Sequence, residues 1–321
     1  MVYAESLPGK IIKGTTLVVV ILFVFSRSIC FVCSANDDGN RVFFAEYFPE
    51  GNDGDTDARI ETAMRDWLLM HSPELPFDDY FIDTRIVGAV RYHADFSLEN
   101  EFDILRELAD IQKDLSLYLA ISAPKETIEV FFFHSKDTYR RFLATEFPKA
   151  PRDRPALYIK QTGPGMVLIV RNPEMQEDLR HEMTHAFLHA TMSYVPIWLD
   201  EGLAEYFEKP RETRATNNSY FTSISRKIIF GQVPSIARLE KMKNFVQVEA
   251  NDYCEAWSWV HFMIHYSPET HQMLAGYMRL LAEQGEKTPP IELYLIKTVQ
   301  DLKRAYLNHF RNWKRSVVSG E

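Results

Sequence analysis

The feature that most constrains the fold is a pair of short segments that place histidines and glutamates at helical spacing. The first is the pentad His-Glu-Met-Thr-His at 181–185, and the second is the octad Trp-Leu-Asp-Glu-Gly-Leu-Ala-Glu at 198–205. Residues four apart on an α-helix lie one turn above each other, so His181 and His185 project from one face. Glu182 lies about 100° further round the axis, beside that face. The pentad therefore predicts a helix that directs two imidazoles and a neighbouring carboxylate to one point.

Both segments have the pattern of helices packed in a protein interior. In the octad, Glu201 and Glu205 fall one turn apart among apolar residues, and Pro196 precedes the apolar start of the helix. Only the short segment 191–196 separates the two helices, which predicts a tight turn. An apolar stripe faces away from the histidines of the first helix, at Leu179, Met183, Ala186, Phe187 and Ala190.

Two imidazoles and a carboxylate form a ligand set that zinc uses in catalytic sites. Such sites hold the ion with three protein ligands and keep a fourth position open for water. His181 and His185 with a glutamate of the octad predict a site for one zinc ion, and Glu182 has the position of the base in an HExxH motif.

Together the two segments resemble the gluzincins, zinc peptidases whose third ligand is a Glu on the helix after HExxH. The octad is similar to the Trp-Leu-Asn-Glu-Gly-Phe-Ala element of gluzincin aminopeptidases. The run through Glu208 is closer to bacterial peptidase-MA-like families of unknown function. The resemblance implies His181, His185 and Glu201 as ligands, Glu182 as the base that activates zinc-bound water, and Glu205 as the acid that orients the first histidine.

The resemblance also implies a fold class. We expect a zincin-like α+β architecture, in which a small mixed β-sheet lies over the HExxH helix and a mostly helical part follows. The sequence departs from the gluzincin pattern in two respects. Fifteen residues separate His185 from Glu201, a shorter gap than in the best-known gluzincins, and Glu205 replaces the Asp of thermolysin-like members. The other large zincin group is excluded, because Leu188 and Thr191 stand where it needs Gly and His or Asp.

A tyrosine further along the chain is a candidate for stabilising the transition state. Tyr253 opens an apolar helix that is similar to the Tyr-x-Lys-Gly helix start of gluzincin aminopeptidases, with Glu255 and Ala256 in place of Lys and Gly. The resemblance implies that Tyr253 shares the charge that develops on the carbonyl oxygen. The alternative is a tyrosine that only packs at a helix N-terminus.

Four other polar residues could belong to the site. His261 and His265 are one turn apart on the helix that Tyr253 opens, so they are either oxyanion donors, a second metal pair, or histidines at the edge of the core. His189 lies two turns from His181, roughly 12 Å along the axis, which is too far for a shared ion. We expect His189 to be packed or hydrogen-bonded. Glu208 could bind a substrate amine, although an exposed ion pair is the simpler expectation.

Residues 1–35 have the organisation of a secretory signal peptide. Lys10 and Lys13 precede the apolar run Leu17–Phe25, and Cys33-Ser34-Ala35 offers a small-residue exit. We expect a secreted, periplasmic or cell-surface protein with no membrane attachment after cleavage. The alternative is an anchor formed by the uncleaved apolar segment. Cleavage would leave Cys254 as the single cysteine, so no internal disulfide is expected.

Composition limits the partners. The chain has a formal net charge of −9 and no run of basic residues, which argues against nucleic-acid binding. Hydrophobic residues make up 46% of the chain, enough for a sizeable core. The expected partner is a peptide or protein substrate.

The pattern along the chain predicts three parts: the leader at 1–35, a loosely structured extension at 36–87, and a zincin-like domain at 88–321. We expect strands at 41–47, 86–93, 128–133, 156–160 and 166–170, and helices at 99–119, 136–147, from 175, 235–242, 253–265, 268–282 and 299–316, with a loop at 211–220. In zincins the edge strand near the metal pairs with extended substrate. We predict Met166–Val170 as that strand, with Ala156–Lys160 as the alternative.

The function predicted from these features is that of a secreted zinc metallopeptidase, which hydrolyses peptide bonds by Glu-assisted attack of zinc-bound water. One rival is a metal-dependent hydrolase of non-peptide amides or esters. The other is a non-catalytic zincin-fold module used for binding or structure. Glu182 argues against that second rival, because a structural site needs ligands but no base.

Overall fold

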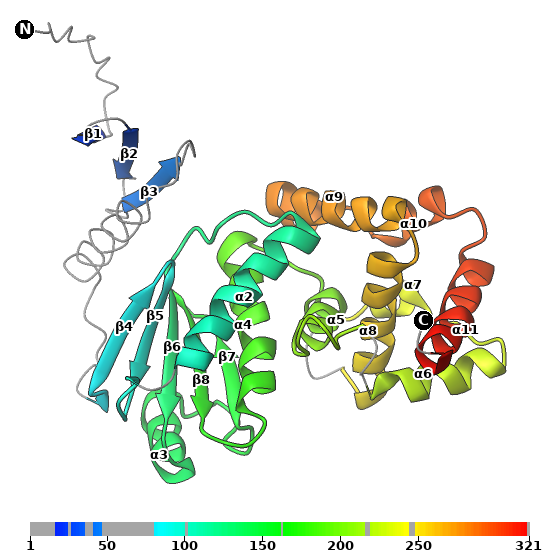
Figure 1. The fold of residues 1–321 in the computed structure, drawn as a ribbon, viewed down its shortest axis with the longest axis horizontal. Coiled ribbons are helices and arrows are strands. Elements are labelled where there is room, and N and C mark those ends of the chain that lie inside the picture. Colours follow the sequence, from blue (N-terminus) through cyan, green and yellow to red (C-terminus); the bar gives the residue numbers. More distant parts are fainter. Residues whose placement is uncertain are drawn as a thin grey trace, which may run out of the picture. The chain divides into compact units, whose positions relative to one another are not determined.

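The structure is a computed structural model that describes residues 17–24, 27–35, 41–46, 80–99, 102–161, 163–215, 219–243 and 248–319. The chain divides into two compact units, residues 1–64 and 65–321 (Figure 1). The first unit contains an antiparallel sheet of β1 (Leu17–Val24), β2 (Arg27–Ala35) and β3 (Arg41–Glu46), in that order. β3 confirms the strand expected at 41–47. β1 and β2 coincide with the expected leader, whose removal stays a prediction.

The second unit is α+β and is built on a five-stranded mixed sheet, as expected. Its strand order is β4-β5-β6-β8-β7. The inner pairs β5–β6 and β6–β8 are parallel, and the outer pairs β4–β5 and β7–β8 are antiparallel. The strands are β4 (Asp83–Val87), β5 (Val90–Ala94), β6 (Ile128–Phe133), β7 (Ala156–Ile159) and β8 (Gly165–Val170).

The single strand predicted at 86–93 is wrong, because this segment turns back on itself. Gly88 adopts a left-handed backbone with φ +59°, which glycine accommodates without strain. Val87 and Val90 are therefore paired across a tight hairpin that joins β4 to β5. The sheet therefore begins at Asp83, which lies before residue 88, the predicted start of the zincin-like domain.

The strand at this edge of the sheet is β7, so Met166–Val170 is not an edge strand and the alternative, Ala156–Lys160, has that position. Its pairing with a substrate stays a prediction. The β7–β8 hairpin places β8 inside the sheet, between β6 and β7. All six residues of β8 are buried, whereas the second half of β7 is half-buried. A continuous apolar run is typical of a strand covered on both faces, and this was the available signal.

Two hydrophobic clusters lie on opposite faces of the sheet. In β6, Val130 and Phe132 join the larger cluster, and Phe131 and Phe133 join the smaller one, as the two-residue period of a strand requires. The larger cluster packs against α2 (Phe102–Leu119) and α4 (Met175–Thr191), and the smaller against α3 (Lys136–Glu146).

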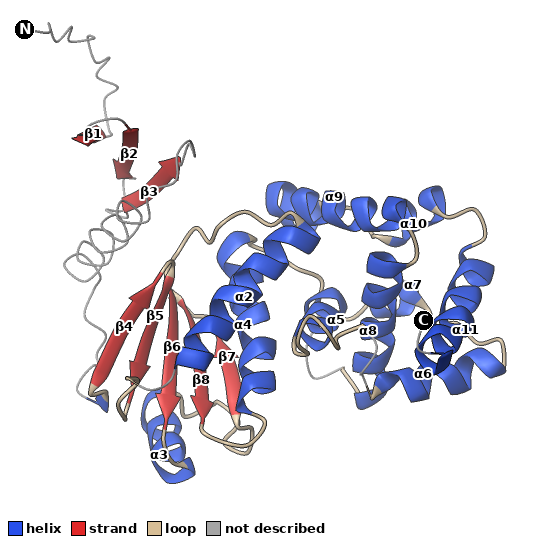
Figure 2. Cartoon of the chain, viewed as in Figure 1, coloured by secondary structure: helices blue, strands red, loops and turns tan. Residues whose placement is uncertain are grey.

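The remainder of this unit is mostly helical, as expected (Figure 2). Four of its helices correspond to those expected at 235–242, 253–265, 268–282 and 299–316. Two others, α6 (Tyr220–Ile229) and α10 (Glu292–Thr298), were not anticipated. Ser219 is the N-cap residue of α6, but its side chain makes no capping hydrogen bond. The helices are α5 (Ile197–Phe207), α6 (Tyr220–Ile229), α7 (Ile236–Leu239), α8 (Ala250–His265), α9 (Pro268–Gln284), α10 (Glu292–Thr298) and α11 (Leu302–Ser319).

Within the described residues, no helix combines the length and the apolar character that crossing a membrane would need.

Candidate metal centre

Helix α4 carries the two histidines of the pentad on the side opposite its apolar stripe. Its apolar stripe is fully buried in the larger hydrophobic cluster, including Leu179, Met183 and Ala186. On the other side His185 is buried and His181 is half-buried. Packing of the apolar face therefore fixes the direction of both imidazoles.

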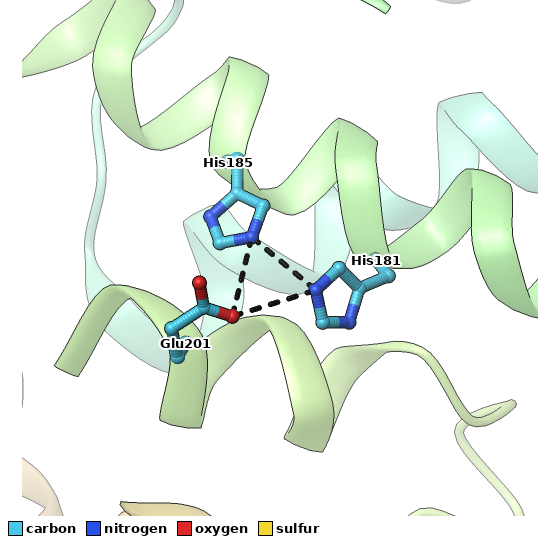
Figure 3. A group of neighbouring side chains, drawn as sticks. All are labelled: His181, His185 and Glu201. Atoms are coloured by element: carbon cyan, nitrogen blue, oxygen red, sulfur yellow. Dashed lines mark hydrogen bonds and ion pairs between the residues drawn. The ribbon is translucent and has the colours of Figure 1, made fainter. Parts of the chain in front are cut away.

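The turn between α4 and α5 brings Glu201 to these histidines (Figure 3). Nε2 of His181 lies 3.3 Å from Nε2 of His185. Oε2 of Glu201 lies 3.6 Å from Nε2 of His181 and 3.7 Å from Nε2 of His185. Three atoms of the types that ligate zinc therefore form a nearly equilateral triangle.

The size of this triangle suits a transition-metal ion. In a tetrahedral zinc site with bonds of about 2.0–2.1 Å, two ligand atoms lie roughly 3.3–3.4 Å apart. The three separations, 3.3, 3.6 and 3.7 Å, are close to that value. His181, His185 and Glu201 thus form a group that could hold a metal ion.

Each histidine has a carboxylate at its other ring nitrogen. Nδ1 of His185 lies 2.9 Å from Oδ1 of Asp200, and Nδ1 of His181 lies 3.4 Å from Oε2 of Glu208. Carboxylates in this position fix the ring orientation and raise the basicity of the ligating nitrogen. Both imidazoles are therefore held with Nε2 toward Glu201.

Asp200 holds a second histidine as well. Its Oδ2 lies 2.9 Å from Nε2 of His189, which confirms that His189 is hydrogen-bonded. His185 and His189 are one turn apart, so one carboxylate reaches both rings. The sequence reasoning missed this role of Asp200; its place directly before Glu201 in the octad was the only signal.

Glu205 and Glu208 lie together at the His181 side of the site. His181, Glu205 and Glu208 form a second group whose ligand atoms lie within 4.8 Å of one another. Nδ1 of His181 contacts Glu208 directly, while Glu205 is buried and hydrogen-bonded to Tyr220. Glu208 is half-buried, and its other oxygen lies 3.5 Å from Nζ of Lys209. The ion pair expected for Glu208 is present, with a contact to His181 in addition.

The electrostatics of the site favour a cation. Burial disfavours protonation of His181, but hydrogen bonds to Glu201 and Glu208 outweigh it and raise the pKa of His181 well above its usual value. Burial likewise opposes protonation of His185, yet the charge of Asp200 raises its pKa to about 9. For Asp200, burial is outweighed by His185 and His189, which lower its pKa. Surplus carboxylate thus surrounds the imidazoles and would stabilise a bound metal ion.

The candidate base and the candidate tyrosine both lie beside this group. Glu182 is half-buried next to His181, and its charge is one of those that raise the pKa of His181. Burial and the charge of Glu201 raise the pKa of Tyr253, opposed by a hydrogen bond with Arg154 and by His181. The fold therefore brings Glu182 and Tyr253, which are far apart in the sequence, close to the candidate metal centre.

The edge strand borders the same centre. Tyr158 in β7 stacks on the ring of His189, with centroids 5.7 Å apart and planes at 13°, and more loosely on His185, at 6.3 Å and 24°. The backbone of β7 therefore passes alongside the histidine row of α4.

Gly202 of the octad allows α5 to lie close to α8. A Cβ at this position would be 2.8 Å from the carbonyl oxygen of Ala256 and 3.0 Å from Val260. Because α5 carries Glu201 and α8 carries Tyr253, this contact fixes the separation of two candidate site residues.

The histidines of α8 lie in a different cluster. Nε2 of His261 donates to the carbonyl oxygen of Ala215 at 3.1 Å, and its Nδ1 is 3.0 Å from Nε2 of His309. Nε2 of His265 lies 2.7 Å from the hydroxyl of Tyr206. Both rings are packed among aromatic side chains, as histidines of the core are.

Comparisons with known proteins identify the same segment. No curated protein matches the chain. Residues 177–289, about a third of the chain, match a family described as "Protein of unknown function (DUF1570)". The matched segment contains the pentad, the octad and Tyr253, so the chain is similar to that family in the part that forms the candidate metal centre.

Proposed function

We propose that the protein is a secreted zinc-dependent metallopeptidase of the gluzincin type, with a zincin-like fold. The observation that carries the proposal is the convergence of His181, His185 and Glu201 on one point, with Glu182 beside it. Bound zinc would supply Lewis acidity, which polarises a carbonyl group and lowers the pKa of water.

The side chains around this point have complementary roles in peptide hydrolysis. Glu182 accepts a proton from the attacking water and delivers it to the leaving amine. The phenol of Tyr253 donates a hydrogen bond to the carbonyl oxygen as negative charge develops there. Asp200 and Glu208 keep the imidazoles oriented through Nδ1.

The open edge of β7 supports a peptide as the substrate. An edge strand has unpaired N–H and C=O groups, to which an extended peptide can add as a further strand. Since Tyr158 in β7 stacks on the rings of His189 and His185, a peptide paired with this strand would pass close to the candidate metal centre.

The test combines metal analysis with a peptide-library cleavage assay on the wild type and on Glu182→Gln. We expect zinc in both proteins and a loss of turnover of about 10²–10⁴-fold in Glu182→Gln, the contribution typical of a positioned base. Glu283→Gln, the same change at an exposed position of α9, is the matched control and should leave turnover unchanged.

Other outcomes would contradict the proposal. Zinc retained without turnover of any peptide would favour a binding or structural module. Turnover of esters or non-peptide amides alone, lost in Glu182→Gln, would favour the other hydrolase class.

A further inference from the structure

A cavity of about 310 Å³ lies at the edge of the sheet where α3 and α4 begin. β6 leads into α3 and β8 leads into α4. Because β6 and β8 are parallel, their carboxyl ends lie at the same edge, the position at which open sheets with parallel strands bind ligands. The segment 152–155, just before the edge strand β7, completes the wall.

Four basic side chains line this cavity, which we call the basic pocket. They are Lys136 and Arg140 on α3, and Arg152 and Arg154 from the segment before β7. The chain as a whole has 45 acidic and 36 basic residues, so this concentration reverses its general balance. No basic run appears in the sequence, because the fold assembles the pocket from two separate segments.

The four cations are available to a ligand. Within the described residues none of them forms an ion pair with a carboxylate; Arg140 donates from Nε to the carbonyl oxygen of Arg152 at 3.4 Å, and Arg154 bonds to Tyr253. Three carboxylates also line the pocket, at Asp153, Glu174 and Asp178. Of these, Asp178 accepts a hydrogen bond from Nδ2 of Asn172 at 3.0 Å.

A buried tyrosine also lines the pocket. Tyr139 lines the pocket and is only 1% exposed, and in the described part of the chain its hydroxyl has no hydrogen-bond partner. Because a buried hydroxyl without a partner is unfavourable, such a group is suited to a ligand that accepts a hydrogen bond.

The pocket adjoins the candidate metal centre on two sides. Asp178 lines the pocket and precedes His181 by one turn of α4. Arg154 lines it as well and is hydrogen-bonded to Tyr253, whose phenol is close enough to Glu201 and His181 to be affected by their charges. A group bound here would thus belong to a residue at or next to the scissile bond.

We propose that the basic pocket is the subsite that binds a carboxylate of the substrate beside the scissile bond. The carboxylate comes either from an Asp or Glu side chain or from the C-terminus of the peptide; both offer oxygen acceptors that match guanidinium donors. The inference rests on the proposed peptidase function and adds its substrate class.

The first test measures kcat and KM for matched peptides that carry Glu or Gln at each position around the cleaved bond, and a free or amidated C-terminus. The variant is the double substitution Lys136→Gln/Arg140→Gln, at two exposed positions. The matched control is Arg141→Gln, on the same helix and exposed but outside the pocket.

At one position, we expect the wild type to cleave the peptide with the carboxylate about tenfold better in kcat/KM than the matched uncharged peptide, which is roughly 1.4 kcal/mol. The difference should come from a lower KM for the peptide with the carboxylate. The preference should fall to about twofold or less in the double variant and stay unchanged in Arg141→Gln. No preference in the wild type, or an equal preference in the double variant, would overturn the proposal. The position that shows the effect identifies the source of the carboxylate.

A second test does not depend on turnover. N-acetylglutamic acid α-amide carries only a side-chain carboxylate, N-acetylglutamine only a terminal one, and N-acetylglutamine amide neither. Calorimetric titration of the purified protein should show binding of one of the two acids, weakened in the double variant but not in Arg141→Gln. If no peptide is cleaved yet this binding occurs, the peptidase proposal fails and the pocket stands. If neither acid binds better than the amide, the pocket proposal fails.

Discussion

The pair His181 and His185 on α4 and the pair His261 and His265 on α8 are each one turn apart, yet the two pairs have opposite surroundings. His181 and His185 meet carboxylates at both ring nitrogens. His261 and His265 meet a backbone carbonyl, a tyrosine hydroxyl and another histidine. The spacing of two histidines therefore predicts only that their rings share a face; the carboxylates contributed by a second helix decide whether the pair can hold a metal ion.

The two clusters also differ in charge. Nearby carboxylates raise the pKa of His185 to about 9. Burial lowers the pKa of His265 to about 4 and that of His309 to about 3. The first cluster thus stabilises positive charge and the second excludes it.

The largest expected effect comes from removing one histidine from each pair. If the wild type binds about one zinc ion per chain, as we propose, His185→Ala should lose most of it, because a ligand is gone. His265→Ala should keep it. Zinc is measured by mass spectrometry, with circular dichroism to check that both variants fold. Equal zinc loss in two folded variants would break the distinction between the clusters.

The carboxylates at Nδ1 should contribute less than the ligands themselves. Asp200→Asn is expected to weaken zinc binding by about 10–100-fold, the usual range for partners of ligating histidines. Glu208→Gln should have a smaller effect, since its contact with His181 is 3.4 Å and its side chain is half-buried, against 2.9 Å for the buried Asp200. Competition with a chelator measures both affinities, and a larger effect for Glu208→Gln would reverse our assignment.

Gly202 tests the contact that joins the helices of the two clusters. Gly202→Ala places a methyl group 2.8 Å from the carbonyl oxygen of Ala256, and we expect a destabilisation of about 1–3 kcal/mol, as for overpacking. Gly276→Ala on α9 is the control, because its nearest neighbour is the flexible end of Arg279 at 4.0 Å. That change should be neutral or stabilising. Urea unfolding compares the two, and equal free energies of unfolding would contradict the close approach of α5 to α8.

The two clusters should lose their contributions to stability at opposite ends of the pH range. His265 on α8 and His309 on α11 have pKa values below the usual 6.5. Between pH 6.5 and its lowered pKa, each of these histidines is protonated in the unfolded chain but neutral in the folded protein. Its contribution to stability is present above pH 6.5 and is lost as the pH falls toward 4 for His265 and 3 for His309. In zinc-free protein the contribution of His185 is present below pH 6.5 and is lost as the pH rises through about 9.

Urea unfolding of zinc-free protein at pH 6.5 and 5.5 checks the acid side of this expectation. His265 and His309 should each lower the free energy of unfolding by at most about 1.4 kcal/mol per pH unit. His309→Gln removes one titrating group, so the drop in its free energy of unfolding should be smaller than in the wild type. A drop of the same size would show that His309 is not held neutral in the folded protein.

The sequence predicted the parts of the site that depend on helical period alone. His181 and His185 follow from their spacing, whereas the choice of Glu201 as third ligand came from the resemblance to the gluzincins. The contact of Asp200 with two histidines depends on how α5 rotates against α4, which spacing does not specify. The basic pocket depends on β6 running parallel to β8 and β7 running antiparallel to it, which brings Lys136 and Arg154 to one edge of the sheet. No local sequence pattern shows this.

The fold was predicted best where the apolar pattern was long and least well where a turn decided the topology. α2 and α4 follow the expected ranges closely. The hairpin at Gly88 and the inward position of β8 were missed, because each depends on which strand pairs with which rather than on any strand's own composition.

The shortness of β7 has a consequence for how long a bound chain would remain. The strand has only four residues, and alternate residues direct their peptide groups to the open side, so about two residues can pair with an added strand. Each such hydrogen bond has a net value of only about 1 kcal/mol. The main chain alone would give a brief residence time, so in the proposed peptidase the selection among bound chains would depend on the side chains.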